Sequence, residues 1–519
     1  KPQTPNLKPQ TPNPFEKILE KAKVDEEFVL NDKNLSHYKS LSMQVTILLG
    51  FLWCSVRGET HPVRFEFDFT NFKLENPLVE EFVSKVALPK AAARIQSWLN
   101  VTDPDPQVIP PLGSDFDCGV DFDKGKRATS STEADLLIFL VSSQSDKING
   151  WFSLSKPCVG NEADGRPRVG VIFISENSFN VSMSFLNKEV SILIHNLLSL
   201  LLFSKEIIFR SPRGESHIAK KIQEGNNTLI KFSGPSLIDY GKIHFNCFEF
   251  NGILSENADN QDLSEVNFEK LMVGDEITTS NFTFRALTSR ITMAVFNDSG
   301  WYQVNSAKSE INMWGRNEGC DFLKMNCKSR FHDFCSDPGQ TFCSEDLRSK
   351  VACSNSSFSG VCKIPVSFFQ HHCAYSNWFL RNFKEETAGP YSRCFLVTAN
   401  SQPSSGCFTS YCSNDRQKLF VVTSKGTFVC EEGLQIELEG NLIIKCPNPN
   451  TFCFVLDMNR CANDCNARGK CLKDNSCDCD LGFSGNQCEF LEPMGISNAL
   501  DQILEAFENS KNTFNVSSL

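Results

Sequence analysis

The sequence is poor in histidine, in basic blocks and in long apolar runs. Its 519 residues include only eight histidines, and no two of these are four residues apart. This excludes an intact zinc motif in which two histidines at i and i+4 share one helix face. The formal net charge is −11, and no segment is strongly basic. Nucleic acid is therefore not an expected partner, because binding it requires a basic surface.

No apolar run predicts a membrane anchor. The run at residues 45–54 has the length of a signal-peptide core and is too short to cross a bilayer. The C-terminal stretch at residues 495–519 is polar and amphipathic, with no hydrophobic tail for a lipid anchor. We therefore expect neither a transmembrane helix nor a lipid anchor.

The short apolar run instead predicts a signal peptide. It follows Met43, and Val56 and Gly58 suit the small-residue positions before a cleavage site. We predict a signal peptide over residues 43–58 and a mature start near Glu59.

Residues 1–42 precede this signal and carry a duplicated KPQTPN at residues 1–6 and 8–13. Their proline-rich, polar composition indicates disorder. We interpret them as a gene-model artefact upstream of the true initiator Met43. A cytosolic tail before a short anchor is the alternative.

Cysteine is abundant. The chain has 23, many in close clusters, which indicates disulfides formed in an oxidising compartment. Losing Cys54 with the signal leaves an even 22. We expect a secreted or cell-surface protein whose partners are extracellular proteins or cell surfaces. Sequons predict glycosylation of several asparagines, and they stand at Asn100, Asn180, Asn226, Asn281, Asn297, Asn355 and Asn515.

Periodicity predicts strands first and then a buried helix. Residues 61–72 alternate polar and apolar side chains, as in a half-buried strand. Residues 134–142 form a near-continuous apolar run, typical of a buried strand, and residues 165–175 predict another strand that is entered through a turn. An amphipathic helix is expected at residues 88–99, and the long apolar run at residues 191–209 favours a buried helix.

That last run begins with a degraded catalytic motif. From His195 it reads HNLLSLLLFS, which resembles the HExxHxxGFS helix of the leishmanolysin family of zinc metallopeptidases. In an intact motif, two histidines hold zinc and the glutamate deprotonates a metal-bound water. Here Asn196 takes the place of the glutamate, Ser199 that of the second histidine and Leu202 that of the glycine. We interpret His195 as a satisfied core residue, and expect Leu202 to cost on the order of 1 kcal/mol at a position needing positive φ.

Further strings carry the same resemblance. EVNFEK at residues 265–270 places Asn267 where the family has its third zinc histidine. Residues 291–305 resemble the family's methionine-containing turn, which implies that Met293 lies under the metal, although an ordinary core role would also explain it. WGRNEGCDF at residues 314–322 resembles the string that follows.

The resemblance covers roughly residues 59–455 and implies a metzincin-type α+β fold, a Cys118–Cys158 disulfide, and a zinc endopeptidase with a second role in adhesion. The replaced residues instead predict a pseudopeptidase with no zinc cofactor. An active enzyme with an aberrant site is the alternative, and a decaying duplicate without a role is a third possibility. A carboxylate metal site of His195, Glu206 and Glu269 has little support.

The last cysteines have the spacing C-x3-C-x5-C-x5-C-x-C-x8-C and end in GFSGNQC. This resembles an EGF-like module, and it predicts the pairs Cys461–Cys471, Cys465–Cys477 and Cys479–Cys488.

The expected organisation follows in order along the chain. After the leader and signal come a metzincin-like domain (59–215), a disulfide-rich central domain (216–365), an antiparallel β domain (366–455), the EGF-like module (456–490) and a polar tail (491–519).

Overall fold

The computed structural model describes most of the chain after the predicted signal. Residues 1–59, and with them the predicted leader and signal peptide, lie outside the described residues. The described residues belong to one compact unit, Thr60–Leu519. They are 60–102, 118, 134–143, 153–158, 164–175, 179, 186–214, 216–224, 227–256, 265–280, 286–324, 334–335, 340–354, 362–374, 383–458 and 461–492.

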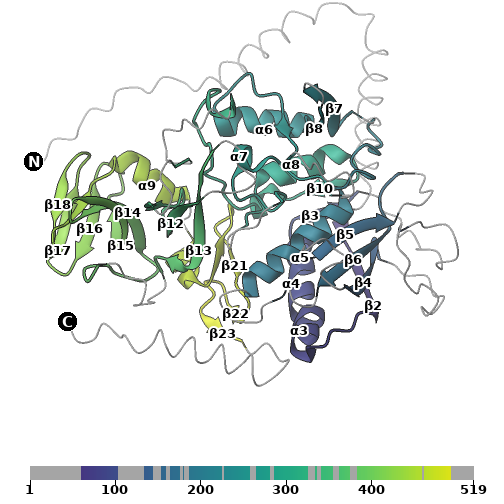
Figure 1. Ribbon diagram of the computed structural model, residues 1–519, viewed down its shortest axis with the longest axis horizontal. Helices are drawn as coiled ribbons and strands as arrows, with labels where there is room; N and C mark the ends of the chain where they lie inside the picture. Colours follow the sequence, from purple (N-terminus) through teal and green to yellow (C-terminus); the bar gives the residue numbers. More distant parts are fainter. Residues whose placement is uncertain are drawn as a thin grey trace, which may run out of the picture. The chain divides into compact units, whose positions relative to one another are not determined.

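The first large sheet has the strand order β2-β4-β6-β5 (Figure 1). Strands β2 (Phe65–Asn71), β4 (Leu136–Ser143) and β6 (Val169–Ser175) are parallel, and β5 (Ser153–Cys158) pairs with β6 as an antiparallel edge strand. The near-continuous apolar runs of β4 and β6 suit central strands covered on both faces. One face of these strands contributes to the main core, and the other packs in a smaller cluster that includes the disulfide Cys118–Cys158.

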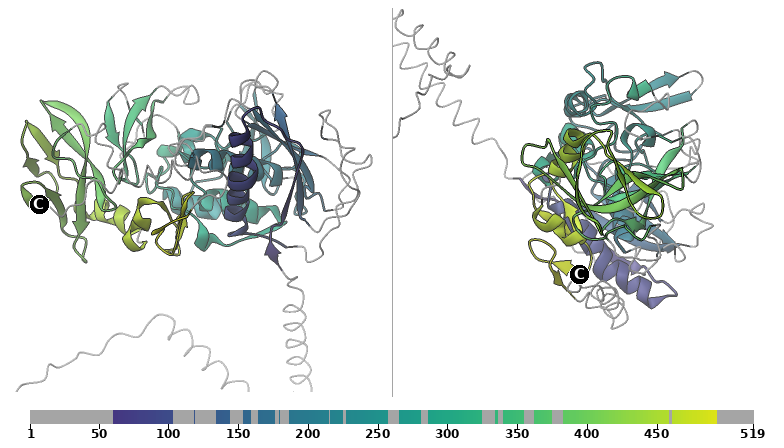
Figure 2. Two further views of the ribbon diagram at one scale, coloured as in Figure 1. Left: turned by 90° about the horizontal axis from the view of Figure 1, so that it is seen from below. Right: turned by 90° about the vertical axis from the view of Figure 1, so that its left-hand side faces the viewer.

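Helices cover the main-core face of this sheet. Helix α3 (Pro77–Phe82) continues through the π-helical turn η1 (Val83–Ala87) into α4 (Leu88–Gln96), which corresponds to the helix predicted at residues 88–99. Figure 2 shows this helical column standing beside the sheet. Helix α5 (Leu186–Leu201) packs against α4 and the edge strand β5. The candidate site therefore lies where α5 meets β5.

The predicted bounds of α5 were wrong at both ends. The helix begins at Leu186 and ends at Leu201, whereas the apolar run predicted residues 191–209. The run continues past the helix because Phe203 is buried in the irregular segment after it, and Ile207 and Ile208 are buried in the turn that follows. The expected strain at Leu202 was also wrong. Leu202 is not among the residues with positive φ, so the chain leaves the helix without the conformation that would favour glycine.

Two small sheets complete the N-terminal half. The stretch predicted as one strand at residues 61–72 is split, because β1 (His61–Pro62) turns away from β2 and pairs with β3 (Leu99–Val101). Strand β10 (Tyr302–Val304) pairs with the other edge of β3. The second small sheet contains β7 (Ala219–Glu224), β8 (Asn227–Phe232) and β9 (Ile253–Leu254).

Helices α6 (Pro235–Phe245) and α8 (Arg290–Ser299) pack together in the central region. Between them in sequence lies the short helix α7 (Lys270–Val273). Two 3-10 turns follow, η4 (Ser306–Lys308) and η5 (Phe322–Lys324). The disulfide Cys247–Cys320 links the end of α6 to the segment before η5.

The C-terminal half is rich in antiparallel sheet, as the sequence predicted. A three-stranded sheet holds β11 (Thr341–Cys343), β12 (Ser349–Ser354) and β13 (Ile364–His372). The disulfides Cys343–Cys394 and Cys373–Cys407 join it to a six-stranded sheet. That larger sheet has the order β17-β16-β15-β14-β19-β18 and is followed by α9 (Pro449–Met458). Its strands are β14 (Ser392–Ala399), β15 (Gln402–Cys412), β16 (Leu419–Thr423), β17 (Gly426–Cys430), β18 (Gln435–Glu437) and β19 (Leu442–Lys445). The predicted boundary between residues 365 and 366 falls inside β13, which belongs with this half.

The last described segment is a small disulfide unit. It contains η7 (Ala462–Ala467), β20 (Gly469–Cys471), β21 (Cys477–Cys479), β22 (Phe483–Ser484) and β23 (Phe490–Leu491). Its disulfides are Cys461–Cys471, Cys465–Cys477 and Cys479–Cys488, the pairs that the cysteine spacing predicted.

This unit is docked onto the N-terminal half rather than held apart from it. Arg94 of α4 contacts Asp478, with 2.8 Å between Nε and Oδ2. Lys308 pairs with Asp474 at 2.7 Å, and the Leu481 backbone N–H donates to Asn187 at the start of α5.

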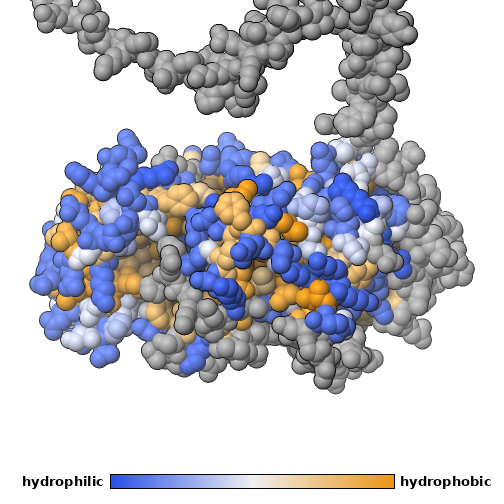
Figure 3. All heavy atoms as spheres, turned by 90° about the horizontal axis from the view of Figure 1, so that it is seen from above, coloured by the Kyte–Doolittle hydropathy of each residue, from blue (hydrophilic) through white to orange (hydrophobic). Residues whose placement is uncertain are grey.

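The surface mixes polar and apolar residues. On the face shown in Figure 3, hydrophilic residues surround separate hydrophobic patches. Among the described residues, no helix combines the length and the apolar character needed to cross a membrane.

Candidate functional site

His195 lies on the buried side of α5 and is only 4% exposed. Its Nδ1 is 2.8 Å from the backbone oxygen of Ile277, and its Nε2 is 3.2 Å from Oε2 of Glu265. Both partners are hydrogen-bond acceptors. The ring of His195 therefore joins the Ile277 backbone to the Glu265 carboxylate through its two nitrogens.

Glu265 fixes this arrangement from the opposite wall. Its Oε1 accepts hydrogen bonds from the backbone N–H (3.2 Å) and the hydroxyl (2.9 Å) of Ser155 on β5. Its backbone bridges Ser204, just past the end of α5. Burial alone would raise the pKa of the Glu265 carboxyl, but the hydrogen bonds from His195 and Ser155 outweigh it and lower the pKa. Glu265 thus stays anionic and links α5 to the edge strand.

Asn196, which the sequence motif predicted to replace a catalytic glutamate, is a structural link. Its side-chain amide donates to the hydroxyl of Ser153 on β5 at 2.6 Å and to the backbone oxygen of Ile192 at 3.0 Å. A carboxamide cannot accept a proton at ordinary pH, so it cannot act as a general base. Asn196 holds the helix against the edge strand.

The two other residues that the motif predicted to replace zinc ligands, Ser199 and Asn267, each have a buried side-chain oxygen. Within the described parts of the chain, neither Ser199 Oγ nor Asn267 Oδ1 has a hydrogen-bond partner. A serine hydroxyl and an asparagine oxygen are neutral and are poor zinc ligands beside thiolate, imidazole or carboxylate.

The turn around Ile277 passes His195, because the Ile277 backbone oxygen lies 2.8 Å from Nδ1. Met293 lies inside helix α8, and its place under a metal stays a prediction. The turn is held by the buried carboxylate of Glu276. That carboxylate accepts hydrogen bonds from the Ser289 backbone N–H (2.9 Å), the Thr292 hydroxyl (2.8 Å) and the Asn312 amide (3.0 Å).

The structure does not group His195 with Glu206 and Glu269 as potential metal ligands. The carboxylate beside His195 is that of Glu265. Glu269 caps α7 by accepting from the Leu271 backbone N–H. Burial, and then the nearby Glu256, raise the pKa of Glu269 to about 7. In the described ranges, one group of three or more potential metal ligands lies close together: Cys461, Cys465 and Cys477, all bound in disulfides.

A zinc ion does not fit the residues around His195. A metal-bound histidine needs a ring nitrogen directed at an open coordination position, whereas both nitrogens of His195 lie within hydrogen-bond distance of protein acceptors. The two other family ligand positions offer only neutral oxygens. The site as built is a closed ionic and hydrogen-bonded contact between α5, β5 and the residue 265–280 segment.

Sequence reasoning missed the two side chains that complete this contact, Glu265 and Ser155. The signal for Glu265 was the alternation of Glu265, Asn267 and Glu269, which places three polar side chains on one side of an extended segment. No pattern in the sequence pointed to Ser155.

Two of the asparagines predicted to be glycosylated lie within the residues that the structure describes. Asn100 lies on β3, and Asn297 lies in α8, where its side-chain amide donates to Ser236 at 2.9 Å. The remaining sites fall outside the described residues, namely Asn180, Asn226, Asn281, Asn355 and Asn515.

Comparison with known proteins gives a consistent result. The family described as leishmanolysin matches residues 94–379, just over half of the chain. The match includes α5 with His195, the residue 265–280 segment and α8.

Three relatives illustrate the similarity. The leishmanolysin-like peptidase of Drosophila melanogaster is 27% identical over 217 residues, covering 39% of this chain and 29% of that protein. The ciliated left-right organizer metallopeptidase of Danio rerio is 24% identical over 364 residues, covering 64% of this chain and 57% of that protein. The leishmanolysin of Leishmania tropica is 25% identical over 165 residues, covering 32% and 24%. The matched region spans less than two thirds of the length of each relative.

Proposed function

We propose, from the premise that this chain belongs to the leishmanolysin family, that it is a pseudopeptidase. It keeps the family's scaffold and does not hydrolyse peptides. In this proposal its role is to bind extracellular proteins or cell surfaces.

One observation carries the proposal: the His195–Glu265 pair. The family's first zinc ligand is bound on both sides by protein acceptors, and a buried ion pair resists losing one partner because the remaining charge would be left uncompensated. Asn196 supports the same conclusion, since its amide is committed to Ser153 and Ile192.

The binding role rests on the surface and on the disulfides. The many disulfides fit an extracellular protein. Ile243 and Phe248 are 73% and 87% exposed, and they flank Cys247 in the sequence. Exposed large apolar side chains, where they gather in a patch, are typical of contact surfaces.

We further propose that the unit from Cys461 to Leu491 is an EGF-like module, because its cysteines have the spacing and the pairing of such a module.

The alternative is an active zinc-dependent metalloendopeptidase that also supports cell adhesion. It is favoured by the family and by relatives whose names include peptidase or metallopeptidase.

Metal analysis and a cleavage assay on the secreted protein separate these two functions. We expect less than stoichiometric zinc after purification in zinc-containing buffer, and no cleavage of a casein-like substrate. Stoichiometric zinc that is lost in a His195→Ala variant, together with cleavage that a zinc chelator stops, would establish the alternative instead.

A further inference from the structure

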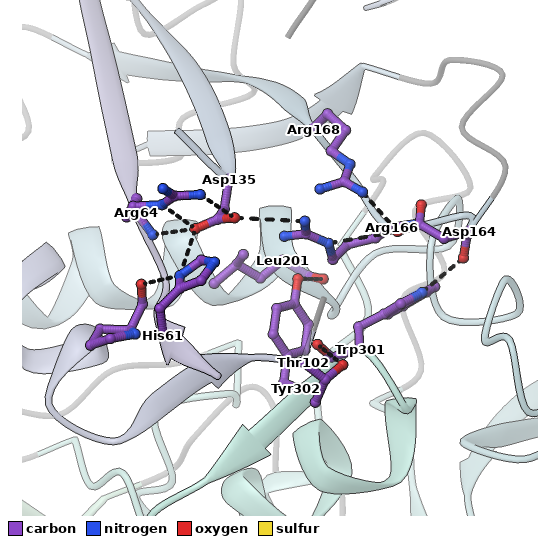
Figure 4. Close-up of polar contacts among 11 residues, drawn as sticks. His61, Arg64, Thr102, Asp135, Asp164, Arg166, Arg168, Leu201, Trp301 and Tyr302 are labelled. Atoms are coloured by element: carbon purple, nitrogen blue, oxygen red, sulfur yellow. Dashed lines mark hydrogen bonds and ion pairs between the residues drawn. The ribbon is translucent and has the colours of Figure 1, made fainter. Parts of the chain in front are cut away.

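A second buried ionic cluster lies away from α5's polar contact, at the amino ends of β2, β4 and β6. Arg64 precedes β2, Asp135 precedes β4, and Arg166 and Arg168 precede β6, with Asp164 in the turn before them. Figure 4 shows these side chains as a row in which positive and negative groups alternate.

Both carboxylates of this row already have a close arginine partner. Asp135 accepts from Arg64 Nε at 3.1 Å, from its Nη2 at 3.3 Å and from its backbone N–H at 2.8 Å. Asp164 accepts from Arg168 Nη2 at 2.7 Å. Arg64 and Arg168 thus each have a carboxylate within hydrogen-bond distance.

Arg166 has no such partner. Its side chain is 1% exposed, and its guanidinium lies between the two aspartates at 3.7 Å from Asp135 and 3.8 Å from Asp164. Both distances are too long for hydrogen bonds. Among the described residues, Nε, Nη1 and Nη2 of Arg166 make no well-formed hydrogen bond, and neither do Nε and Nη1 of the buried Arg168. The neutral hydroxyl of Tyr302 lies near the Arg166 side chain but brings no negative charge.

Within the parts of the chain that the structure describes, the surroundings do not supply the missing negative charge. There the cluster holds three guanidinium groups and two carboxylates. His61 lies 3.6 Å from Asp135 and adds no negative charge. The hydroxyl of Tyr302 and the indole of Trp301 are neutral, and burial raises the pKa of Tyr302 further, so it stays protonated. A buried charge without a counter-charge is strongly unfavourable, and each unpartnered buried donor adds to the cost.

We propose that this cluster is a binding site for one small inorganic anion, chloride, held against the guanidinium groups of Arg166 and Arg168. One negative charge would neutralise the one positive charge by which the guanidinium groups exceed the carboxylates. A halide also accepts hydrogen bonds from several directions. Arg166, Trp301 and Tyr302 are almost completely buried, which favours an ion about the size of a water molecule over an organic anion. The bound ion would hold together the starts of three parallel strands.

The first test uses the unmodified protein. The Tm is measured at increasing chloride concentration with ionic strength held constant by gluconate, an anion too large for the site. We expect the Tm to rise with the logarithm of chloride concentration, because a ligand that binds only the folded state stabilises it by mass action. A Tm independent of chloride would overturn the proposal and would indicate that water satisfies the arginines.

Location is tested by variants and by bromide. Arg166→Gln removes the excess charge and should abolish the chloride dependence. Arg416→Gln is the matched control, since Arg416 is 45% exposed and pairs with Asp457 in the C-terminal half; this variant should keep the dependence. A crystal grown in bromide should show an anomalous peak beside Arg166. An unchanged dependence in Arg166→Gln, or a dependence lost equally in Arg416→Gln, would contradict this site. A crystal without the peak would do so even if Arg166→Gln does not fold.

Discussion

Two buried ionic clusters in the N-terminal half differ in how completely the protein satisfies them. At His195 and Glu265, one positive and one negative group meet, and both ring nitrogens and both carboxylate oxygens have protein partners. At Arg166, positive groups outnumber negative ones and three nitrogens lack partners among the described residues. The first cluster lies where a family motif predicts a metal ion. The second lies where no sequence motif predicted a bound ion.

The difference shows that a motif's position and a need for a ligand are separate properties. When the zinc ligands of a helix are replaced, the surrounding polar groups can pair with one another and close the site, as Glu265 does with His195. An ion is required only where buried charge remains uncompensated. The comparison therefore predicts that the His195 cluster resists an ion until its internal partner is removed, whereas the Arg166 cluster depends on one.

The largest expected effect comes from rebuilding the zinc site. The substitutions Asn196→Glu, Ser199→His and Asn267→His restore the family's ligands and base, but Glu265 still occupies Nε2 of His195. We expect weak zinc binding from these three changes and stoichiometric binding when Glu265→Gln is added. Structural zinc sites contribute about 10–16 kcal/mol in favourable cases, so the gain should be plain by metal analysis and calorimetry.

The matched control for this rebuilding keeps Asn196 and changes only the other three positions. It should bind zinc and leave casein intact. If the first three substitutions alone give stoichiometric zinc, Glu265 does not close the site. If the fourfold variant folds and binds none, the pocket no longer has the family's geometry.

The second effect is on stability. Glu265→Gln leaves the buried His195 without its counter-charge, and breaking a buried pair from one side costs about 3–5 kcal/mol. We expect the free energy of unfolding, measured in urea, to fall by roughly the lower of these values, because a neutral amide can still accept one hydrogen bond. A double change to His195→Leu and Glu265→Leu should recover part of the loss. A loss below about 1 kcal/mol in the single variant would mean that the pair does little to hold α5.

The third effect sharpens the contrast between the clusters. The destabilisation caused by Arg166→Gln should be larger in chloride than in gluconate, because the variant loses the ion's contribution, about 2.7 kcal/mol at 100 times Kd. The loss caused by Glu265→Gln should be the same in both salts. Equal salt dependence in the two variants would mean that the Arg166 cluster does not differ from the His195–Glu265 pair in needing an ion.

The smallest effect is a pH dependence confined to the first cluster. Because the pKa of Glu265 is lowered in the folded protein, its stabilising contribution is present above its ordinary pKa and is lost as pH falls through the lowered value. Unfolding free energies of the unmodified protein and of Glu265→Gln should therefore begin to converge as pH falls below the ordinary glutamate pKa of about 4.3, and should meet below the lowered pKa. Parallel curves over this range would show that Glu265 is not held as an anion.

Sequence alone predicted the elements whose signal is local. The continuous apolar run of β4 and the cysteine spacing of the last unit each lie within a short window. The end of α5 was missed because Phe203, Ile207 and Ile208 are apolar for a tertiary reason: they fill the core from the irregular segment and the turn after the helix. Hydrophobicity reports burial, and it reports helix only where the periodic pattern continues.

The candidate site was predictable in part for the same reason. His195 and Asn196 were found because they share a ten-residue string with a known motif. Glu265 was missed because it is separated from His195 by 70 residues. A local sequence pattern does not predict which of several distant glutamates will pack against a given helix. Ser155, on an edge strand before both, gave no signal at all.

The docking of the last disulfide unit onto α4 has a consequence for biosynthesis. Arg94 is largely buried and faces Asp478, nearly four hundred residues later in the chain. At about 5–20 residues per second, a ribosome makes the second residue on the order of tens of seconds after the first. During that interval the nascent N-terminal domain exposes an unpaired arginine and an uncovered helix face. The α4 face of the N-terminal half is thus covered by a segment made much later, and a chain interrupted before Cys461 would leave that face open to chaperones.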